Sequence, residues 1–239
     1  MRRQETIAPL ALIATGLAGI AWFWLELAPP RLGFDDTDSP EVSLRFLHAH
    51  PEVYAQAGVA LFVLAAALLA ATFVVADALA ERSGRFAVRM LSAIGLISGA
   101  SFFLHGVLRF SAEPILYIDG LDHDWGQAAY LAVQMVGIHG FAQAGSFGLC
   151  AWVVGVSIVG VRAKVVPAAL ALLAVLPGFR LVGLLIAHFV TLPDATWLIG
   201  IAAIPGVMLW CLLLGVVFLR RHATAHAPRR ITVARVEAG

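Results

Sequence analysis

Long apolar runs dominate the chain and predict membrane-spanning helices. A helix that crosses the roughly 30 Å hydrocarbon core of a bilayer needs about 20 apolar residues. Six stretches meet that length, namely residues 7–28, 57–79, 87–109, 135–160, 165–189 and 197–219. The roughly ten-residue alternating segments of a membrane barrel are absent, and an open sheet cannot satisfy its backbone in lipid. The pattern therefore predicts an all-α fold, a bundle of six transmembrane helices.

Shorter helices are predicted between the spans. Ser39 is a good N-cap and Pro40 a good first helical residue, which predicts a helix over residues 40–49. The apolar residues of this segment predict that it lies on the membrane surface. Pro51 would end it and open the helix that runs into the second span. Residues 127–134 are expected to extend the fourth span outward.

Basic residues fall on one side of the predicted membrane. Twelve of the sixteen Lys and Arg residues lie there: Arg2, Arg3, Arg82, Arg85, Arg89, Arg162, Lys164, Arg220, Arg221, Arg229, Arg230 and Arg235. The positive-inside rule makes this side cytoplasmic and places both termini inside. We expect one six-helix transmembrane domain over residues 1–219, followed by a disordered basic cytoplasmic tail over residues 220–239.

The composition agrees with this topology and excludes other classes of protein. Apolar residues make up 61% of the 239-residue chain and charged residues 13%, against roughly 45–50% and about 25% in soluble domains. The net charge of +1 gives no basic field for nucleic acid. The predicted partner is the lipid bilayer, and the predicted location is a bacterial plasma (inner) membrane. Gly95 and Gly99, four residues apart on the third span, predict a packing seam, that is, a line of small residues along which another helix packs closely. Such a seam is compatible with an oligomer.

Polar side chains recur at helical spacing near the predicted outer ends of three spans. The stripes are Ser101, His105 and Arg109 in the third span, His139 and Gln143 in the fourth, and Arg180 and His188 in the fifth. Residues four or eight apart share one helix face. Ionisable groups in spans normally face a bundle interior or a water-filled cavity. We therefore predict that these stripes border one outward-facing cavity.

Arg180 is the most informative of these residues because it lies within a span. Its side chain either extends along the helix to the membrane–water interface or pairs with Glu26 or an anionic ligand. For Glu26, near the outer end of the first span, solvation is the favoured interpretation. Pro177 just before Arg180, and Pro205 in the sixth span, each remove a backbone hydrogen bond and predict kinks.

Three interpretations of the histidines stay open. A zinc or copper site near the membrane surface would use His48, His50 and His123, since imidazole is a common ligand of both metals. A haem would need a pair drawn from His105, His139 and His188, and is less favoured than a metal ion. No HExxH or CxxC motif supports either cofactor. The favoured interpretation is that the histidines bond to backbone, acidic residues and water.

Several segments resemble the small six-span membrane proteins of unknown function that are common in actinobacteria. The resemblance rests on Arg89-Met90 opening a third span rich in Gly and Ser, on Cys150-Ala151-Trp152, on residues 162–167 and on the Trp210 span. It covers about the last two thirds of the chain. Because those families have no assigned activity, it implies only a fold and a compartment, and no functional residue carries over.

The leading functional hypothesis is a binding protein. We expect the outward-facing cavity to bind a small or lipid-like ligand through His105, Arg109, His139, Gln143, Arg180 and His188. One alternative is a membrane-embedded enzyme that uses a metal or haem held by the same histidines. A small-molecule transporter and a subunit of a larger membrane complex stay open as well.

Overall fold

The chain is all-helical in the residues that the structure, a computed structural model, describes: 2–26, 40–112, 124–187 and 195–226. The longer helices are α1 (Arg2–Glu26), α4 (Pro51–Ala80), α5 (Arg85–Val107), α8 (Gln143–Arg162), α10 (Val175–Ala187) and α11 (Ala195–His226). The shorter ones are α3 (Pro40–Ala49), α7 (Asp124–Gln134) and α9 (Ala168–Ala171). Two π-helical segments, η1 (Leu108–Ala112) and η2 (Met135–Ala142), and a 3₁₀ turn, η3 (Leu172–Ala174), complete the described chain. The predicted all-α class is confirmed for these residues.

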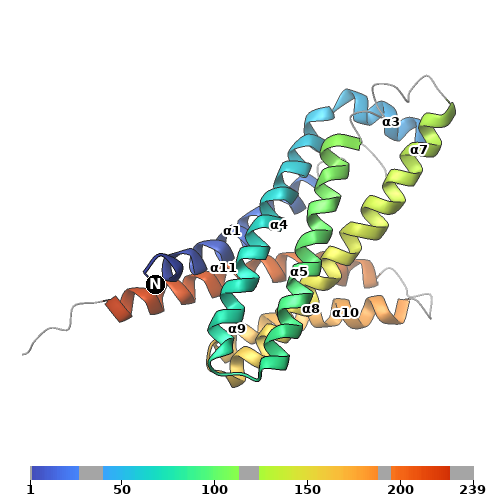
Figure 1. Cartoon of the computed structure of the whole chain (residues 1–239). Helices are drawn as coiled ribbons and strands as arrows, with labels where there is room; N and C mark the ends of the chain where they lie inside the picture. Colours follow the sequence, from blue (N-terminus) through green and yellow to red (C-terminus); the bar gives the residue numbers. More distant parts are fainter. Residues whose placement is uncertain (1, 27–39, 113–123, 188–194, 227–239) are drawn as a thin grey trace, which may run out of the picture.

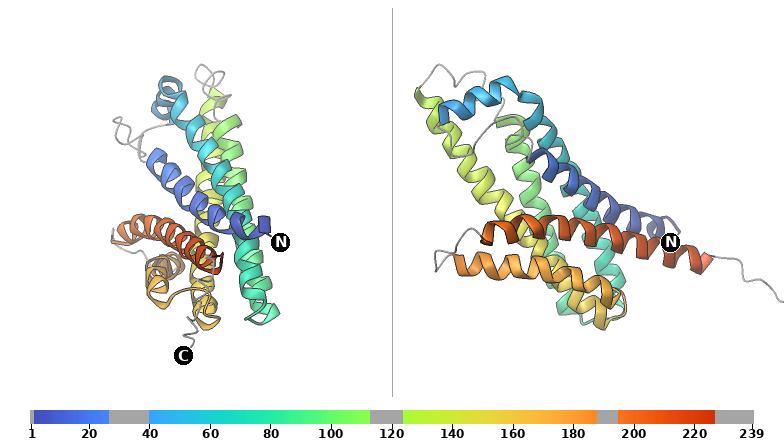
Figure 2. Two further views of the ribbon diagram at one scale, coloured as in Figure 1. Left: turned by 90° about the vertical axis from the view of Figure 1, so that its left-hand side faces the viewer. Right: turned by 180° about the vertical axis from the view of Figure 1, so that it is seen from behind.

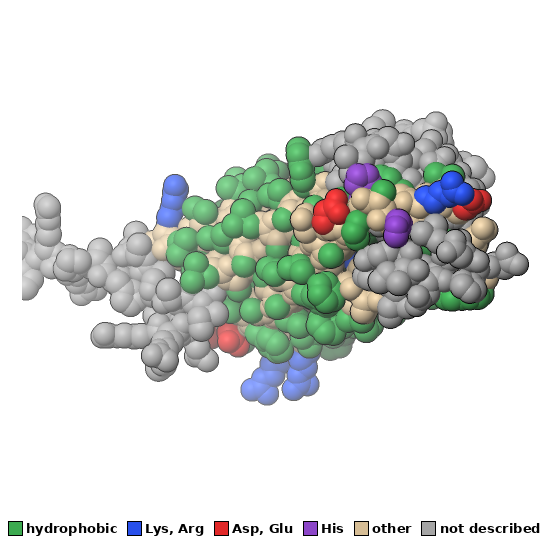
Figure 3. Space-filling view, turned by 90° about the horizontal axis from the view of Figure 1, so that it is seen from above, with side chains coloured by type: hydrophobic (Ala, Val, Ile, Leu, Met, Phe, Trp, Pro, Cys, Tyr) green, Lys and Arg blue, Asp and Glu red, His purple; other side chains and the backbone are tan. Residues whose placement is uncertain are grey.

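Five helical stretches in the described residues are long and apolar enough to cross a membrane. They are Pro9–Glu26, Pro51–Ala80, Arg85–Ser111, Trp125–Arg162 and Ala203–Arg221, and they match five of the six predicted spans. Their outer surfaces are apolar as well, because side chains such as Phe73 and Ile97 are more than half exposed. Figure 3 shows a face covered mainly by hydrophobic side chains, with few and scattered charges. The chain therefore has the helices and the surface of a membrane protein.

The predicted fifth span, residues 165–189, differs from expectation. It is not one continuous α-helix, because α9 and α10 are separated by the 3₁₀ turn η3. Its described helical part runs from Ala168 to Ala187 and includes η3, and the last two residues of the predicted span, 188–189, lie outside the described chain. Pro177 explains the position of the break: it has no N–H to donate to the carbonyl of Leu173, so regular α-helix begins only at Val175.

The predicted shorter helices form where the sequence placed them. α3 covers residues 40–49, Pro51 is the first residue of α4, and α7 extends the fourth span outward. α3 buries Leu44 against Val53, Tyr54 and Tyr130, so part of its apolar face packs on the protein and not on lipid. The expected disorder after Leu219 is wrong for the first residues, because α11 continues to His226. Residues 227–239 lie outside the described chain.

The helices do not form a bundle of six parallel rods. In Figures 1 and 2, α4 and α5 run side by side, and the α10–α11 pair crosses them steeply. α1 packs on both α4 and α11, and α8 packs on α5 and α10. α1 and α11 run in opposite directions along each other, with the start of α1 beside the end of α11 (Figure 1).

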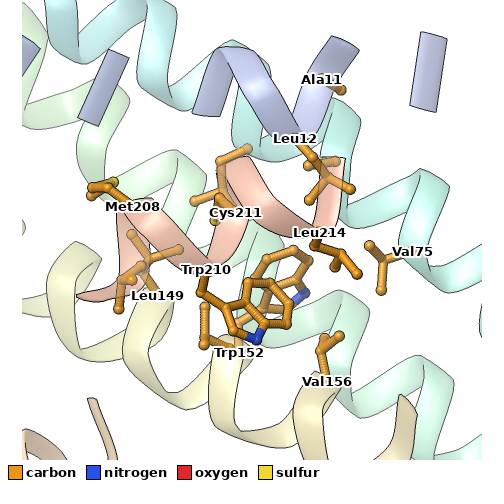
Figure 4. Packing of buried hydrophobic residues seen from close by; sticks show 14 of the residues in the cluster. Ala11, Leu12, Val75, Leu149, Trp152, Val156, Met208, Trp210, Cys211 and Leu214 are labelled. Carbon is orange, nitrogen blue, oxygen red and sulfur yellow. The ribbon is translucent and has the colours of Figure 1, made fainter. Parts of the chain in front are cut away.

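Large apolar side chains from α1, α4, α8 and α11 meet in one buried cluster (Figure 4). We call this cluster, which surrounds Trp152 and Trp210, the tryptophan core. The two indole rings stand edge to face with their centroids 6.0 Å apart. Two buried hydroxyls of the same helices bond to backbone: Thr15 Oγ1 donates to the Ala11 carbonyl and Thr72 Oγ1 to that of Leu68, each at 2.8 Å. Hydrogen bonds within each helix therefore satisfy these two hydroxyls without a charged partner.

Small residues set the distance between neighbouring helices. A Cβ built on Gly148 of α8 would lie 2.9 Å from Ser98 Cβ of α5, and one on Gly99 would lie 2.9 Å from Leu69 Cδ2 of α4. Gly95 is likewise closed in by Thr72 and Trp152. The predicted role of Gly95 and Gly99 as a packing seam is confirmed within the chain.

Candidate functional site

A carboxylate near one end of the fold gathers three side chains around it. Arg109 Nη2 donates to both oxygens of Glu26, at 3.3 Å to Oε1 and 3.1 Å to Oε2. Trp22 Nε1 donates to Oε1 at 3.0 Å, and His105 Nε2 lies 3.8 Å from the same oxygen. We call these four residues, together with Tyr54, the Glu26 cluster. Its members come from α1, α4, α5 and η1.

Helical spacing explains how pairs of these residues come together. Trp22 and Glu26 are one turn apart at the end of α1, so the indole reaches the carboxylate of its own helix. His105 and Arg109 are also one turn apart, and Ser101 lies one turn before His105. All three are buried, as expected for one helix face. The predicted stripe on the third span is therefore confirmed as a single inward-facing row.

The guanidinium of Arg109 is enclosed on a second side by an aromatic ring. Its central carbon lies 5.0 Å from the centroid of the Tyr54 ring, within the range of a cation–π interaction. Tyr54 belongs to the small apolar cluster beneath α3, with Leu44, Val53 and Tyr130. The short surface helix α3 thereby supports the tyrosine that covers Arg109.

Burial makes it costly to leave one charge of the ion pair without the other. The side chain of Arg109 is 5% exposed and that of His105 is 2% exposed, whereas Glu26 keeps 29%. A buried guanidinium without a carboxylate would carry a large desolvation cost. Arg109 therefore needs a carboxylate partner as long as it is present, and Glu26 is the member of the pair that also faces accessible space.

Glu26 and His105 face a pocket of about 270 Å³. We call it the Arg180 pocket. Its other polar walls are Gln143 and Ser146 of α8 and Arg180 of α10. The apolar walls are Trp22, Phe23, Ala142 and Ile204. Side chains from α1, α5, α8, α10 and α11 thus border an open pocket that has hydrogen-bond donors, one carboxylate and apolar surface.

The residues predicted to share a cavity meet in part. His105, Gln143 and Arg180 line the Arg180 pocket. Arg109 contacts Glu26, which is itself a wall of the pocket. The backbone of His139 belongs to η2, but its side chain lies outside the part of the chain that the structure describes, as does His188. Three of the six predicted residues therefore line the pocket, and a fourth, Arg109, bonds to one of its walls.

The two π-helical segments flank the site. η1 carries Arg109, and η2 ends where Gln143 begins α8. Gly137 of η2 is buried, and a Cβ built there would lie 3.3 Å from Leu108 Cδ1 and 3.4 Å from His105 Nδ1. The imidazole therefore occupies room that a glycine on the π turn leaves open.

The metal hypothesis finds no support in the described residues. No three His, Cys, Asp or Glu side chains among them are grouped to hold a metal ion. His48 lies in the last turn of α3 and His50 caps α4, where His50 Nδ1 lies 3.6 Å from Glu52 Oε1. His123, the third predicted ligand, falls outside the described residues. The haem pair needs His139 or His188, so that hypothesis also stays a prediction.

Three members of the Glu26 cluster differ from what the sequence indicated. Glu26 is not simply a solvated carboxylate, as the sequence favoured, because Arg109 bonds to it. Trp22 and Tyr54 carried no predicted role. The spacing of Trp22 and Glu26 was a usable signal, but the contact with Tyr54 depends on how α4 packs on α5 and η1.

Comparisons with protein-family models, with curated proteins and with solved structures give no match to the chain. The functional interpretation therefore rests on the geometry and chemistry of the site.

Proposed function

We propose that this chain is an integral protein of a bacterial plasma membrane that binds a small or lipid-like ligand in the Arg180 pocket. One observation carries the proposal. Ionisable side chains from three separate helices, Glu26, His105 and Arg180, border a single pocket in a chain with five helices that are long and apolar enough to cross a membrane. Ionisable residues within membrane helices are expensive to bury and are most often functional.

The lining indicates the chemistry of the ligand. Arg180 contributes a positive charge, and Gln143 and Ser146 contribute neutral hydrogen-bonding groups. The negative charge of Glu26 is matched by Arg109. The described walls together with Arg109 therefore carry a net positive charge. These features favour a ligand with a carboxylate, a phosphate or another hydrogen-bond acceptor.

The size of the pocket restricts the ligand further. About 270 Å³ is slightly below the roughly 300–1,000 Å³ of pockets that enclose drug-sized molecules. A small metabolite fits such a volume, and so does the polar end of a lipid whose chain extends along the apolar walls Phe23 and Ile204. The resemblance to small actinobacterial membrane proteins supports the proposed compartment and adds nothing on the ligand.

Charge-selective cysteine labelling tests the pocket. Gln143→Cys or Ser146→Cys, each treated with a sulfonate-bearing and a trimethylammonium-bearing methanethiosulfonate reagent, should react faster with the anionic reagent. Arg180→Gln should reduce this preference by about fivefold or more, the effect of roughly 1 kcal/mol of local charge. The native Cys150 and Cys211 are buried and should not react.

Matched controls make the experiment decisive. Ile158→Cys lies on an exposed apolar surface of α8 and should resist both reagents if that surface faces lipid. Arg162→Gln removes a positive charge from the far end of the same helix and should leave the preference unchanged. Failure of both pocket cysteines to react, or equal rates with both reagents, would overturn the proposal.

Retention of a ligand supplies a second test. Mass spectrometry of small molecules and lipids extracted from the purified protein should find a species that the wild type and Arg162→Gln retain and Arg180→Gln loses. An identical extract from all three proteins would contradict ligand binding at Arg180.

A further inference from the structure

A second pocket of about 270 Å³ lies at the other end of α1 and α4. We call it the Arg221 pocket. It opens between Pro9 near the start of α1, Ala78 near the end of α4 and Phe218 of α11. The Glu26 cluster uses the opposite ends of α1 and α4, so the two pockets are separate sites. In Figure 1 the start of α1 and the end of α11 lie side by side at this end.

Two guanidinium groups and one carboxylate line the Arg221 pocket: Arg82, Arg221 and Glu81. The local balance of these described side chains is therefore positive. Arg82 is exposed and follows the last turn of α4, where its backbone N–H donates to the Leu79 carbonyl at 3.0 Å. A guanidinium can present two parallel N–H groups to a phosphate oxygen pair.

Arg221 is fixed in place by the turn that closes α8. Its Nη1 donates to the carbonyl of Val165 at 2.7 Å. Lys164 has φ of 58°, and the N–H groups of Val165 and Val166 both donate to the Gly160 carbonyl, at 2.8 and 3.0 Å. This left-handed helix cap holds the Val165 carbonyl toward α11. The pocket wall is thereby preorganised by backbone bonds.

The remaining walls are apolar: Pro9, Ala78, Val165 and Phe218. The pocket therefore combines paired guanidinium groups with a hydrophobic surface, which suits an amphiphile with a negative headgroup. At this end of the fold lie Arg82 and Arg221, two of the basic residues that the positive-inside rule predicts to be cytoplasmic. Basic pockets between helices on that side are suited to anionic lipid headgroups.

We propose that the Arg221 pocket binds the headgroup phosphate of an anionic phospholipid, with Arg82 and Arg221 contacting the phosphate and Phe218 contacting the start of the acyl chains. A lipid is favoured over a free phosphate ion because four of the seven walls are apolar. The site is independent of the proposed ligand of the Arg180 pocket.

Lipid-selective binding tests the proposal on the full chain purified in detergent. Native mass spectrometry with phosphatidylglycerol and with phosphatidylcholine of identical acyl chains should show tighter binding of phosphatidylglycerol. Replacing both arginines, as Arg82→Gln with Arg221→Gln, should weaken this preference by about 25-fold, which is about fivefold for each charge near a lipid headgroup.

A matched control removes the same charge from the same end of the molecule. Arg85→Gln with Arg89→Gln changes two exposed α5 residues that do not line the pocket, and the lipid preference should stay within about twofold of wild type. Because Arg221→Gln also breaks the bond to Val165 and could disturb the fold, Arg82→Gln alone provides a second test, with an expected loss of about fivefold.

Three outcomes would overturn the proposal. One is equal binding of the two lipids by the wild type, and another is an equal loss in the control and pocket variants. The third is displacement of phosphatidylglycerol by millimolar inorganic phosphate, which would identify a free-anion site. Charge-selective labelling at residue 143 should be unchanged in Arg82→Gln, so failure at one pocket is distinguishable from failure at the other.

Discussion

The tryptophan core and the Glu26 cluster share the helices α1 and α4 and the side chain of Trp22, but one is held by apolar contacts and the other by paired charges. α1 contributes Leu12 to the core and Glu26 to the cluster, and α4 contributes Leu68 to one and Tyr54 to the other. The core is held by contacts between apolar side chains and by small residues that let helices approach. The cluster is held by a buried ion pair. In lipid, close packing holds helices together because burying apolar surface gives no advantage over contact with lipid tails.

This difference separates a region that only packs from a region whose charged side chains also border the proposed ligand pocket. An apolar, tightly packed interior needs no charged group, so charges at the other end of the same helices are an added cost. The cost is offset by pairing at Arg109, yet Glu26 and His105 remain directed at a pocket. Substitutions in the two regions should therefore differ in how much they lower the free energy of unfolding. Only a loss caused by an unpaired charge should be relieved when the second charge is removed as well.

Removing the cation of the Glu26 cluster should have the largest effect. Arg109→Met leaves Glu26 without its partner, and we expect a loss of about 3 kcal/mol in the free energy of unfolding. This is the low end of the range for buried pairs because Glu26 is 29% exposed. Reversible unfolding in detergent, followed by tryptophan fluorescence, measures it.

The double variant Arg109→Met with Glu26→Gln serves as the control. Because neither charge remains, it should be more stable than Arg109→Met alone. Additive losses in this double-mutant cycle would show that the pair is not coupled.

Filling the seam between α5 and α8 should have an intermediate effect. Gly148→Ala places a Cβ 2.9 Å from Ser98 Cβ, and we expect a loss of about 2 kcal/mol from overpacking. Gly183→Ala on α10 is the matched control, since no atom lies within 4 Å of its added Cβ. Thermal denaturation of both variants in one detergent measures the difference, and a similar shift in both would contradict the role of the seam.

The cation–π contact should have the smallest effect. A double-mutant cycle of Tyr54→Leu and Arg109→Met should give a coupling free energy of about 1 kcal/mol, between the values for exposed and for fully desolvated cation–π pairs. Tyr130→Leu changes a tyrosine of the same small apolar cluster and should show no coupling to Arg109→Met. Equal coupling for both tyrosines would assign the effect to general packing beneath α3.

Much of the fold was predictable from local features of the sequence. Apolar length located five spans, and Pro40 and Pro51 located the starts of α3 and α4. The spacing of Ser101, His105 and Arg109 predicted one buried face. These features depend on residues that are near one another in the chain. The chemistry of proline predicted a disturbance near Pro177, but not that it takes the form of the 3₁₀ turn η3.

The partners across helices were not predictable in the same way. The sequence suggested Arg180 as a partner for Glu26. Arg109 is expected at a similar depth in the membrane, and it is the residue that bonds to Glu26. The packing of α1 on α4 brings Glu26, at the end of α1, to Arg109. α10 and α11 cross α4 and α5 steeply (Figure 2), and Arg180 of α10 lines the pocket. Helix periodicity fixes a residue's face but not the neighbour that the face meets.

The sequence by itself determined that the chain is helical, apolar and suited to a membrane, because these properties follow from hydropathy and from backbone hydrogen bonding within each segment. It also determined which polar residues share a helix face. Only the tertiary structure decided that Arg109 pairs with Glu26, that Tyr54 covers the guanidinium, and that Arg180, Gln143 and His105 border one pocket. Those contacts join residues far apart in the chain, and their geometry follows from helix crossing and close packing, which no local pattern encodes.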